Sequence, residues 1–564
     1  RSFVECPLYD CAGISRRLNA VDELLGDPVK LKNFTEEMAG IYDLERLMTR
    51  VVYNTANAKE LLSLKTTLEP LPKIREMLSD SRSALLREIC DDMDLLEDVR
   101  ELVTDAIRED APFSVREGGM IADGFNAELD ELREIVKGGK SYLSTLEQKE
   151  QEATGIKKLK IGYNRVFGYY YEVSNSFKEL VPDTYIRKQT LTNCERYITE
   201  ELKELESKVL GAQERIVSLE YEVFCAVRKK IAAQYERTRK TAKAVATLDT
   251  LCSLATVAAA NHYTRPEIND SGIISITEGR HPVIEKMLDG APFVPNDTLL
   301  DNGENRTAII TGPNMAGKST YMRQVALIVL LAQMGSFVPA KAASIGLCDS
   351  IFTRVGASDD LAAGQSTFMV EMREVAEILE NATSKSLIIL DEIGRGTSTY
   401  DGMSIARAVL EFTADRKKLG AKTLFATHYH ELTELENTVE GVKNYNIAVK
   451  KRGDDITFLR RIIRGGADGS YGIDVAKLAG VPDSVVRRAK VILKALEAND
   501  NAAARKPLPI EEAPEEEPEE KLQMTLSGGS AGEIVEELKA LDVNTLTPIE
   551  AMTKLYELVN KAKQ

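Results

Sequence analysis

Nine residues, Gly312 to Thr320 (GPNMAGKST), have the types and spacing of a loop that binds the phosphates of a nucleotide. They follow the apolar run 308–310 and match the pattern G-x-x-x-x-G-K-[S/T]. In such a loop, glycines let backbone N–H groups surround phosphate oxygens, the lysine reaches the β- and γ-phosphates, and the adjacent hydroxyl ligates Mg²⁺. The predicted phosphate-binding residues are Gly312, Pro313, Asn314, Met315, Ala316, Gly317, Lys318, Ser319 and Thr320, with Ser319 also on the metal.

Two acids follow a second apolar run, Leu387 to Leu390 (LIIL). Asp391 is predicted to hold Mg²⁺ through water, and Glu392 is predicted to orient or deprotonate the attacking water. Because side chains alternate along a strand, the two carboxylates point in different directions and can take different roles.

A histidine closely follows a third apolar run, Thr423 to Ala426. His428 can donate a hydrogen bond to the γ-phosphate and so respond to its loss. The order of phosphate loop, acid pair and histidine favours this role over a structural one. The other three histidines, at positions 262, 281 and 430, have no such context.

The segment Gly364–Glu371 (GQSTFMVE) lies between the phosphate loop and the acids. ATPases of the ABC class place there the loop that closes over a partner subunit's γ-phosphate, and we predict Ser366 for this contact. A second segment, LSGGS at 526–530, is closer in letters to the transporter signature L-S-G-G-Q. It lies beyond the acids and after a Pro- and Glu-rich stretch, so its position argues against that role.

The elements that must position these residues are indicated by the hydrophobic pattern. From about residue 265 to 464, short apolar strands alternate with helices. This pattern predicts an α/β domain that binds its ligand at the carboxyl ends of the strands. The run 321–334 is predicted to be a helix whose N-terminus faces the phosphates.

The part before residue 265 is predicted to be mainly helical. Residues 1–124 have helical patterns, and heptad seams follow over 125–146 and 198–223. Between the seams, 159–174 is rich in aromatic and β-branched residues and predicts strands. The economical interpretation is an arm of two long helices with a β-rich tip. Two bundle helices around a hairpin fit the pattern equally well.

This tip is basic, although the whole chain has a net charge of -16. Seven Lys or Arg against three Asp or Glu give the segment 157–188 a balance of +4. The segment Thr192–Glu195 has the pattern of a capping box, which predicts that the second long helix starts there. A helix N-terminus beside basic side chains suits a phosphate backbone without base specificity. An ordinary capped helix is the alternative.

Composition bounds the class of protein. A chain of 564 residues is too long for one core, so several domains are expected. Its seven cysteines lack C-x-x-C spacing, which argues against a disulfide framework or a zinc site. The longest apolar stretch, 325–332, is too short to span a bilayer, and no signal peptide opens the chain. We expect a cytoplasmic protein without membrane contact.

The chain resembles the MutS family of DNA mismatch-repair ATPases over essentially its whole length. In the ATPase part the resemblance is carried by TGPNMAGKSTYMRQ, FTRVGASDDLAAGQSTFMVEM, LDEIGRGTSTYDG and FATHYHEL. In the DNA clamp it is carried by YNRVFGYYYEVS and RKQTLTNCERYI. EGRHPV followed by APF also fits, and there the family stacks an aromatic side chain, here Phe293, on adenine.

The resemblance implies a homodimer that encircles double-stranded DNA, with two composite sites for ATP and Mg²⁺ and a MutL-type partner. It implies a catalytic set of Lys318, Ser366, Glu392 and His428, and contacts with the DNA backbone from Arg187, Thr192 and Asn193. The implied multidomain architecture is a helical core and lever (1–141), a β-rich DNA clamp (142–200), a returning lever helix (201–264), an α/β ATPase domain of the ABC class (265–464), a helical dimerisation brace (465–498), an acidic flexible linker (499–532) and helices for higher-order association, such as a tetramer (533–564).

One part of the family pattern is not found. The family's mismatch reader is an N-terminal domain with an F-x-E motif, whereas Phe34-Thr-Glu36 fits the letters but lies in a helical segment. We therefore expect ATP chemistry and nonspecific DNA binding without direct mismatch readout. Two other interpretations stay open: a recombination-type clamp ATPase that binds branched DNA, and a non-enzymatic DNA scaffold locked by ATP.

Overall fold

The computed structural model describes residues 1–499 except 165, 167, 289–291, 314–315, 357–366, 453–454 and 467–470. It contains two compact units, 1–486 and 487–564. Several predicted features lie outside the described residues: Asn314, Met315, Ser366, the segment 526–530, the linker from residue 500 and the terminal helices.

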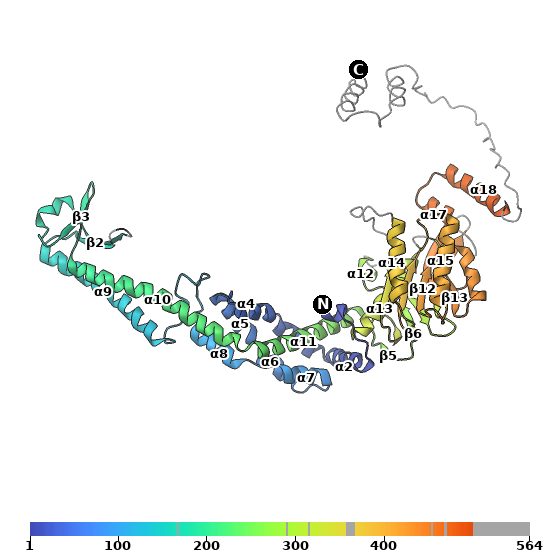
Figure 1. Ribbon diagram of the computed structural model, residues 1–564, viewed down its shortest axis with the longest axis horizontal. Coiled ribbons are helices and arrows are strands. Elements are labelled where there is room, and N and C mark those ends of the chain that lie inside the picture. Colours follow the sequence, from blue (N-terminus) through green and yellow to red (C-terminus); the bar gives the residue numbers. More distant parts are fainter. Residues whose placement is uncertain are drawn as a thin grey trace, which may run out of the picture. The chain divides into compact units, whose positions relative to one another are not determined.

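Residues 1–124 fold as helices, which confirms the prediction for this segment (Figure 1). Polar N-caps explain where several of them begin, because Asp10, Asp27, Asp43 and Asn57 each accept a hydrogen bond from a backbone N–H of the first turn. The helices are α1 (Ser2–Glu5), α2 (Cys11–Gly26), α3 (Pro28–Met38), α4 (Leu44–Val52), α5 (Ala58–Leu68), α6 (Leu71–Leu78), α7 (Ala84–Asp92) and α8 (Glu97–Ala106).

One long helix, α11 (Tyr235–Asn261), is the centre of this helical part. It packs against α2, α3, α4 and α7 and buries apolar side chains such as Leu248 and Leu251. Among the helices that the structure describes, α11 alone is long and apolar enough to cross a membrane by length and composition. Its apolar side is the side that the neighbouring helices cover, as in the core helix of a helical domain.

The two heptad seams form a pair of packed helices, α9 (Ala127–Thr154) and α10 (Glu200–Ala232), which confirms the predicted arm (Figure 1). A buried carboxylate ties the two helices together where the pair begins. Glu220 on α10 accepts a hydrogen bond from the Met120 N–H at 3.1 Å and from Arg133 Nη2 at 2.7 Å. Because Arg133 belongs to α9, the contact fixes the start of one helix against the other.

The tip of the arm is a four-stranded antiparallel sheet in the order β1-β2-β4-β3. The strands β1 (Lys160–Asn164) and β2 (Gly168–Ser174) lie in the predicted β-rich segment, whereas β3 (Ile186–Thr190) and β4 (Cys194–Ile198) were not predicted. A short 3₁₀ helix, η1 (Asn175–Leu180), follows β2.

The prediction that the second long helix starts at Thr192 is wrong. Glu195 does not cap a helix: it lies in β4 and is buried, with its carboxylate 2.7 Å from Lys178 Nζ. The true N-cap is Thr199, whose hydroxyl accepts the Leu202 N–H at 3.3 Å, so α10 begins at Glu200. The first residue of the predicted seam, Ile198, therefore belongs to a strand.

Two sheets form the part from residue 265 onward. The larger is six-stranded in the order β10-β11-β12-β8-β13-β14, parallel except for β14. Its strands are β8 (Thr307–Thr311), β10 (Ile351–Arg354), β11 (Leu387–Asp391), β12 (Lys422–Ala426), β13 (Val442–Arg452) and β14 (Asp455–Arg464). The smaller sheet, mainly antiparallel, has the order β5-β9-β6-β7, with β5 (Glu267–Asn269), β6 (Ile274–Gly279), β7 (Asn296–Leu300) and β9 (Ala342–Gly346).

Helices cover both faces of the larger sheet (Figure 1). Leu387 and Ile389 pack with α13 (Lys318–Gln333) and the smaller sheet, whereas Ile388 and Leu390 pack with α14 (Thr367–Asn381) and α15 (Thr399–Ala414). Strands covered on both faces read as continuous apolar runs, which is why the sequence shows them clearly. The remaining described helices are α12 (Ile284–Met287), η2 (His430–Glu434), α16 (Leu435–Thr438), α17 (Gly472–Leu478) and α18 (Asp483–Asn499).

Candidate functional site

The predicted nucleotide-binding residues meet at one edge of the larger sheet. The strands β8, β12 and β11 are parallel neighbours, with Asp391 in register with Ala426 and Ala426 in register with Ile310. Their carboxyl ends therefore lie side by side. This register brings the loop after β8, the acids at the end of β11 and His428 after β12 into one site.

The phosphate loop has the backbone that its glycines allow. Gly312 has a φ of 135° and Gly317 a φ of 110°, values that favour glycine. α13 begins at Lys318, so its N-terminus and its positive dipole end lie at the loop. A helix N-terminus beside these two glycines can bind an anion.

Lys318 is held inside this loop. Its Nζ donates to the Gly312 carbonyl at 2.5 Å and lies 3.4 Å from the Pro313 carbonyl, and the residue is only 3% exposed. Burial lowers the pKa of Lys318 to about 8, against the opposing effect of Glu392. A phosphate beside this ammonium group would favour its charged form.

Glu392 and His428 form a charged cluster with Lys318. The Nε2 atom of His428 lies 2.7 Å from Glu392 Oε1, where it donates to the carboxylate, and 3.2 Å from Lys318 Nζ. Arg395 pairs with the other oxygen of Glu392. Burial alone would raise the pKa of Glu392, but hydrogen bonds from His428 and Arg395 outweigh burial and lower that pKa to about 2. A carboxylate with this pKa stays ionised at neutral pH, so it can accept a hydrogen bond from the attacking water and orient it.

Asp391 and Ser319 have the chemistry of a magnesium site. Burial raises the pKa of Asp391, against the opposing effect of the neighbouring Ser319 hydroxyl. The Oδ1 atom of Asp391 is buried and has no hydrogen-bond partner among the described residues, so it can accept a cation or its bound water. Within the described part of the chain no cluster of three or more His, Cys, Asp or Glu side chains could hold a metal. One carboxylate with nucleotide phosphates is a common set for Mg²⁺, so these residues fit it.

A cavity of 240 Å³ adjoins the phosphate loop. Phe293 lines it together with Gly317 and Thr320 of the loop. Ile284, Leu288 and Val294 add further apolar surface. An aromatic ring beside the loop is the arrangement that a nucleotide base requires, since bases stack on aromatic side chains.

The structure also brings in residues that the sequence analysis gave no role. Arg395 reaches the carboxylate of Glu392 from three residues further along the chain, and this spacing was a possible signal. Tyr429 donates from its hydroxyl to the Gly394 carbonyl at 3.1 Å, and Glu371 accepts the Gly394 N–H at 2.6 Å. These contacts join segments far apart in the sequence, so no local pattern indicated them.

The three residues predicted to contact DNA lie in the tip sheet. Thr192 and Asn193 are exposed in the turn that joins β3 to β4. Arg187 on β3 is 58% exposed in its side chain and lies 3.5 Å from the carboxylate of Glu195. None of the three is at a helix N-terminus, so the helix dipole expected to support these contacts is not present there.

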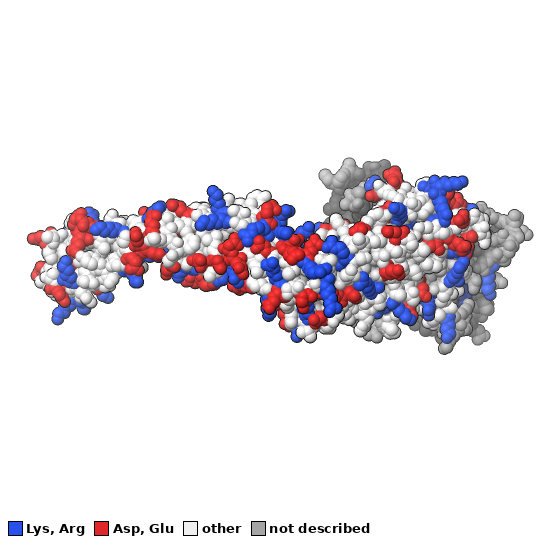
Figure 2. Space-filling view, turned by 90° about the horizontal axis from the view of Figure 1, so that it is seen from below, with Lys and Arg blue, Asp and Glu red and all other residues white. Residues whose placement is uncertain are grey.

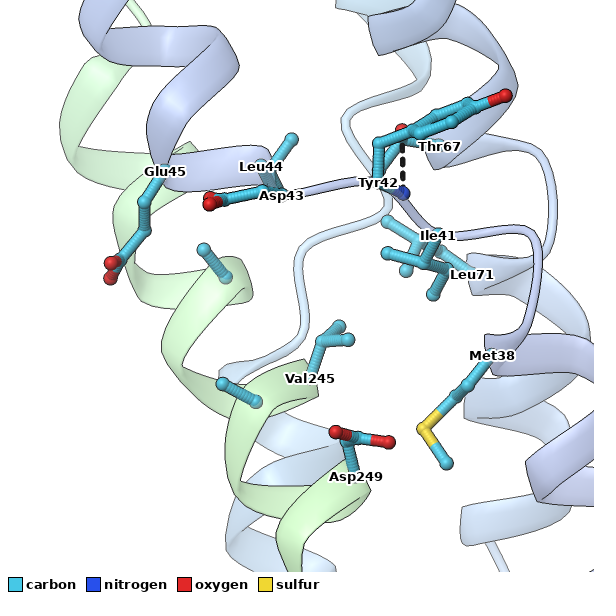
Figure 3. A pocket seen from close by; sticks show the side chains of 12 residues that line it. Met38, Ile41, Tyr42, Asp43, Leu44, Glu45, Thr67, Leu71, Val245 and Asp249 are labelled. Carbon is cyan, nitrogen blue, oxygen red and sulfur yellow. Dashed lines mark hydrogen bonds between the residues drawn. The ribbon is translucent and has the colours of Figure 1, made fainter. Parts of the chain in front are cut away.

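One face of the surface carries charges of both signs (Figure 2), and a further cavity lies in the helical part. On the face drawn in Figure 2, Lys and Arg side chains are interspersed with Asp and Glu. A cavity of 330 Å³ in the helical part is lined by residues that include Tyr42, Asp43 and Asp249 (Figure 3). Its lining includes none of the predicted site residues.

Known protein-family models match most of this chain. MutS domain III matches residues 1–255, MutS domain V matches 308–497, and the DNA mismatch repair protein MutS C-terminal region matches 530–561. The matched ranges include the arm, the larger sheet and the phosphate loop.

Curated relatives match over the whole chain. The DNA mismatch repair protein MutS of Acetivibrio thermocellus is 55% identical over 563 residues, covering 100% of this chain and 64% of that protein. The protein of the same name from Caldicellulosiruptor saccharolyticus is 56% identical over 567 residues, with 100% and 65% covered. That of Clostridium botulinum is 47% identical over 627 residues, with 100% and 67% covered. The chain thus spans about two thirds of the length of these relatives.

Proposed function

The chain belongs to the MutS family of DNA mismatch-repair proteins. On this premise we propose that it binds and hydrolyses ATP to switch a dimeric DNA clamp between mismatch-searching and sliding states. The observation that carries the proposal is the meeting of Lys318, Glu392 and His428 at the ends of three parallel strands, beside a helix N-terminus. Such a site can bind a nucleotide triphosphate and direct water at its terminal phosphate.

Each residue of the site has a distinct task in this proposal. Lys318 and the loop backbone bind the β- and γ-phosphates, and Phe293 stacks on the adenine. Ser319 and Asp391 hold Mg²⁺, which supplies positive charge to the phosphate oxygens when bound. Glu392 orients the attacking water, and His428 links that carboxylate to the γ-phosphate.

The proposal also assigns a role to each segment of the chain outside the nucleotide site. We assign 265–464 to an ATPase domain of the ABC class, 465–498 to a dimerisation brace, 499–532 to a linker and 533–564 to association of dimers. The helical core and lever (1–141), the clamp (142–200) and the returning lever helix (201–264) together enclose double-stranded DNA. Ser366 of each subunit completes the site of the other in a homodimer, and a MutL-type protein follows as the downstream partner in the bacterial cytoplasm.

Replacing the loop lysine tests the proposal directly. In Lys318→Ala, ATP turnover is expected to be abolished, while binding to duplex DNA persists, because the residues assigned to DNA lie in the tip sheet. The measurements are phosphate release and fluorescence anisotropy with matched and mismatched duplexes. Equal loss of ATP turnover and DNA binding would contradict the division of tasks. Full phosphate release by Glu392→Gln would contradict the role of that residue, whereas no phosphate release by the unaltered chain would favour the scaffold.

A further inference from the structure

One residue beside the site carries a role that its local sequence does not indicate. We infer that Glu371, on α14, is a positioning residue: with Arg354 it holds the turn 392–394 in the conformation that presents Glu392 to the nucleotide. The inference deepens the proposed ATP hydrolysis and rests on it.

The turn after β11 has a backbone conformation that needs contacts from other parts of the chain. Glu392 has a φ of 57°, in the left-handed region that residues with a Cβ rarely adopt. Such a backbone persists only where the surroundings determine it. The Glu392 N–H donates to the Ala426 carbonyl at 2.9 Å, which fixes the first residue of the turn and leaves the next two to other contacts.

Glu371 provides the main contact at the end of this turn. Its Oε1 accepts the Gly394 N–H at 2.6 Å, and the residue is only 7% exposed. A short hydrogen bond to a buried carboxylate is among the stronger backbone contacts that a side chain can make. The Tyr429 hydroxyl donates to the Gly394 carbonyl at 3.1 Å. The N–H and the carbonyl of Gly394 are thus both held by side chains from other elements.

Arg354 compensates the charge of Glu371. Its guanidinium is buried, with Nη2 at 3.5 Å from Glu371 Oε2 and Nη1 donating to the Gly356 carbonyl at 2.7 Å. Arg354 ends β10, the neighbour of β11 in the sheet. The pair therefore ties the turn to both a strand and a helix. A buried carboxylate without such a partner would be costly, so the two residues act as one unit.

Loss of Glu371 is expected to affect hydrolysis more than nucleotide binding. In Glu371→Gln the charge is removed, the Gly394 contact weakens and Glu392 moves. Since a displacement of about 1 Å at a catalytic group costs about a hundredfold in rate, we expect kcat for ATP to fall ten- to hundredfold. KM should change less than about threefold, because the Lys318 loop is untouched.

A neighbouring acid offers a matched control. Glu377 lies on the same helix, is exposed and is not among the residues that hold the turn. Glu377→Gln should keep kcat within about twofold of the wild type, as expected for a substitution at an exposed position away from the site. Glu371→Asp keeps the charge and should recover part of the lost kcat.

The experiment measures steady-state ATP hydrolysis, ATP affinity and hydrogen exchange of the peptide containing Gly394 in the full chain. Glu371→Gln is expected to lower kcat selectively and to speed exchange at that peptide. Wild-type kcat, unchanged exchange, or a fall in ATP affinity as large as the fall in kcat would overturn the inference. If the wild type itself did not hydrolyse ATP, the proposed function would fail, and hydrogen exchange would still decide whether Glu371 holds the turn.

A milder variant covers the case in which Glu371→Gln does not fold. Tyr429→Phe removes the hydroxyl that holds the other side of Gly394 and keeps the ring. It should lower kcat about threefold with KM unchanged, in line with the loss of one neutral hydrogen bond. Wild-type kcat and wild-type exchange in this variant would also overturn the inference.

Discussion

The cavity beside the phosphate loop leads to a quantitative prediction for Phe293. Its ring lines the same 240 Å³ space as Gly317 and Thr320 of the loop, so one nucleotide can place its base on the ring and its phosphates on the loop. In Phe293→Ala the base loses its aromatic partner. Stacking of a base on an aromatic side chain contributes about 1–3 kcal/mol. At 1.4 kcal/mol per tenfold, ATP affinity should fall by a factor of about 5 to 150.

The effect should be confined to ligands that carry a base. Inorganic triphosphate binds the loop without touching the ring, so its affinity should stay the same in Phe293→Ala. Because the lost contact stabilises bound substrate and transition state equally, KM for ATP should rise while kcat stays unchanged. The assay is isothermal titration with ATP and with triphosphate, followed by steady-state ATP hydrolysis.

Two further variants sharpen this test. Phe293→Tyr keeps a ring and should bind ATP within about threefold of the wild type. Phe113, which is 74% exposed and does not line the cavity, provides the control Phe113→Ala, whose affinities should not change. A parallel loss of ATP and triphosphate binding in Phe293→Ala would show damage to the loop, and unchanged ATP binding would show that the base lies elsewhere. Either result would refute the reasoning.

Two predictions concern the helical part. Glu220→Ala removes the buried acceptor of Arg133 and of a main-chain N–H, so urea unfolding should show a loss of about 3 kcal/mol. Arg237→Gln removes the hydrogen bonds that, more than any other cause, lower the pKa values of Asp94 and Asp98. The interactions that lower these two carboxylate pKa values stabilise the fold above about pH 4, and this stabilisation is lost as the pH falls through the lowered values. The loss of about 1 kcal/mol in unfolding free energy that we expect for Arg237→Gln at pH 7 should therefore be smaller at pH 3.

A control for Glu220→Ala is available in the same helix. Glu222→Ala removes an exposed partner of Arg215 and should change stability by less than about 0.5 kcal/mol. A Glu220→Ala protein as stable as Glu222→Ala would show that the buried carboxylate does not fix the arm. An Arg237→Gln protein with the same deficit at pH 3 and pH 7 would show that its role is packing and not charge.

The strand ends of the candidate nucleotide site could be predicted because the sequence patterns that mark them span only a few consecutive residues. The apolar runs before Asp391 and His428 become β11 and β12, and the glycine spacing around Lys318 becomes the loop before α13. Strands buried on both faces must be apolar at every position, so they are visible without knowledge of their neighbours. Parallel pairing then requires the residues after these strands to meet at one edge.

The tip of the arm shows where local patterns mislead. Thr192 and Glu195 have the spacing of a capping box, yet the second of them is a strand residue whose carboxylate binds Lys178. The same residue types can form a helix cap or part of a strand, and which structure they form depends on their cross-strand partners. Those partners are supplied by β2, about twenty residues earlier in the chain.

The sequence by itself determined which residues are candidates to bind phosphate, metal and water, because each of those roles needs particular side chains at short spacings. Only the tertiary structure decided how they are held. The left-handed turn at Glu392 depends on Glu371 and Tyr429, which are 23 residues before and 35 residues after Gly394. Contacts of this kind arise when separate helices and strands pack together, and such packing produces no periodic pattern in the sequence.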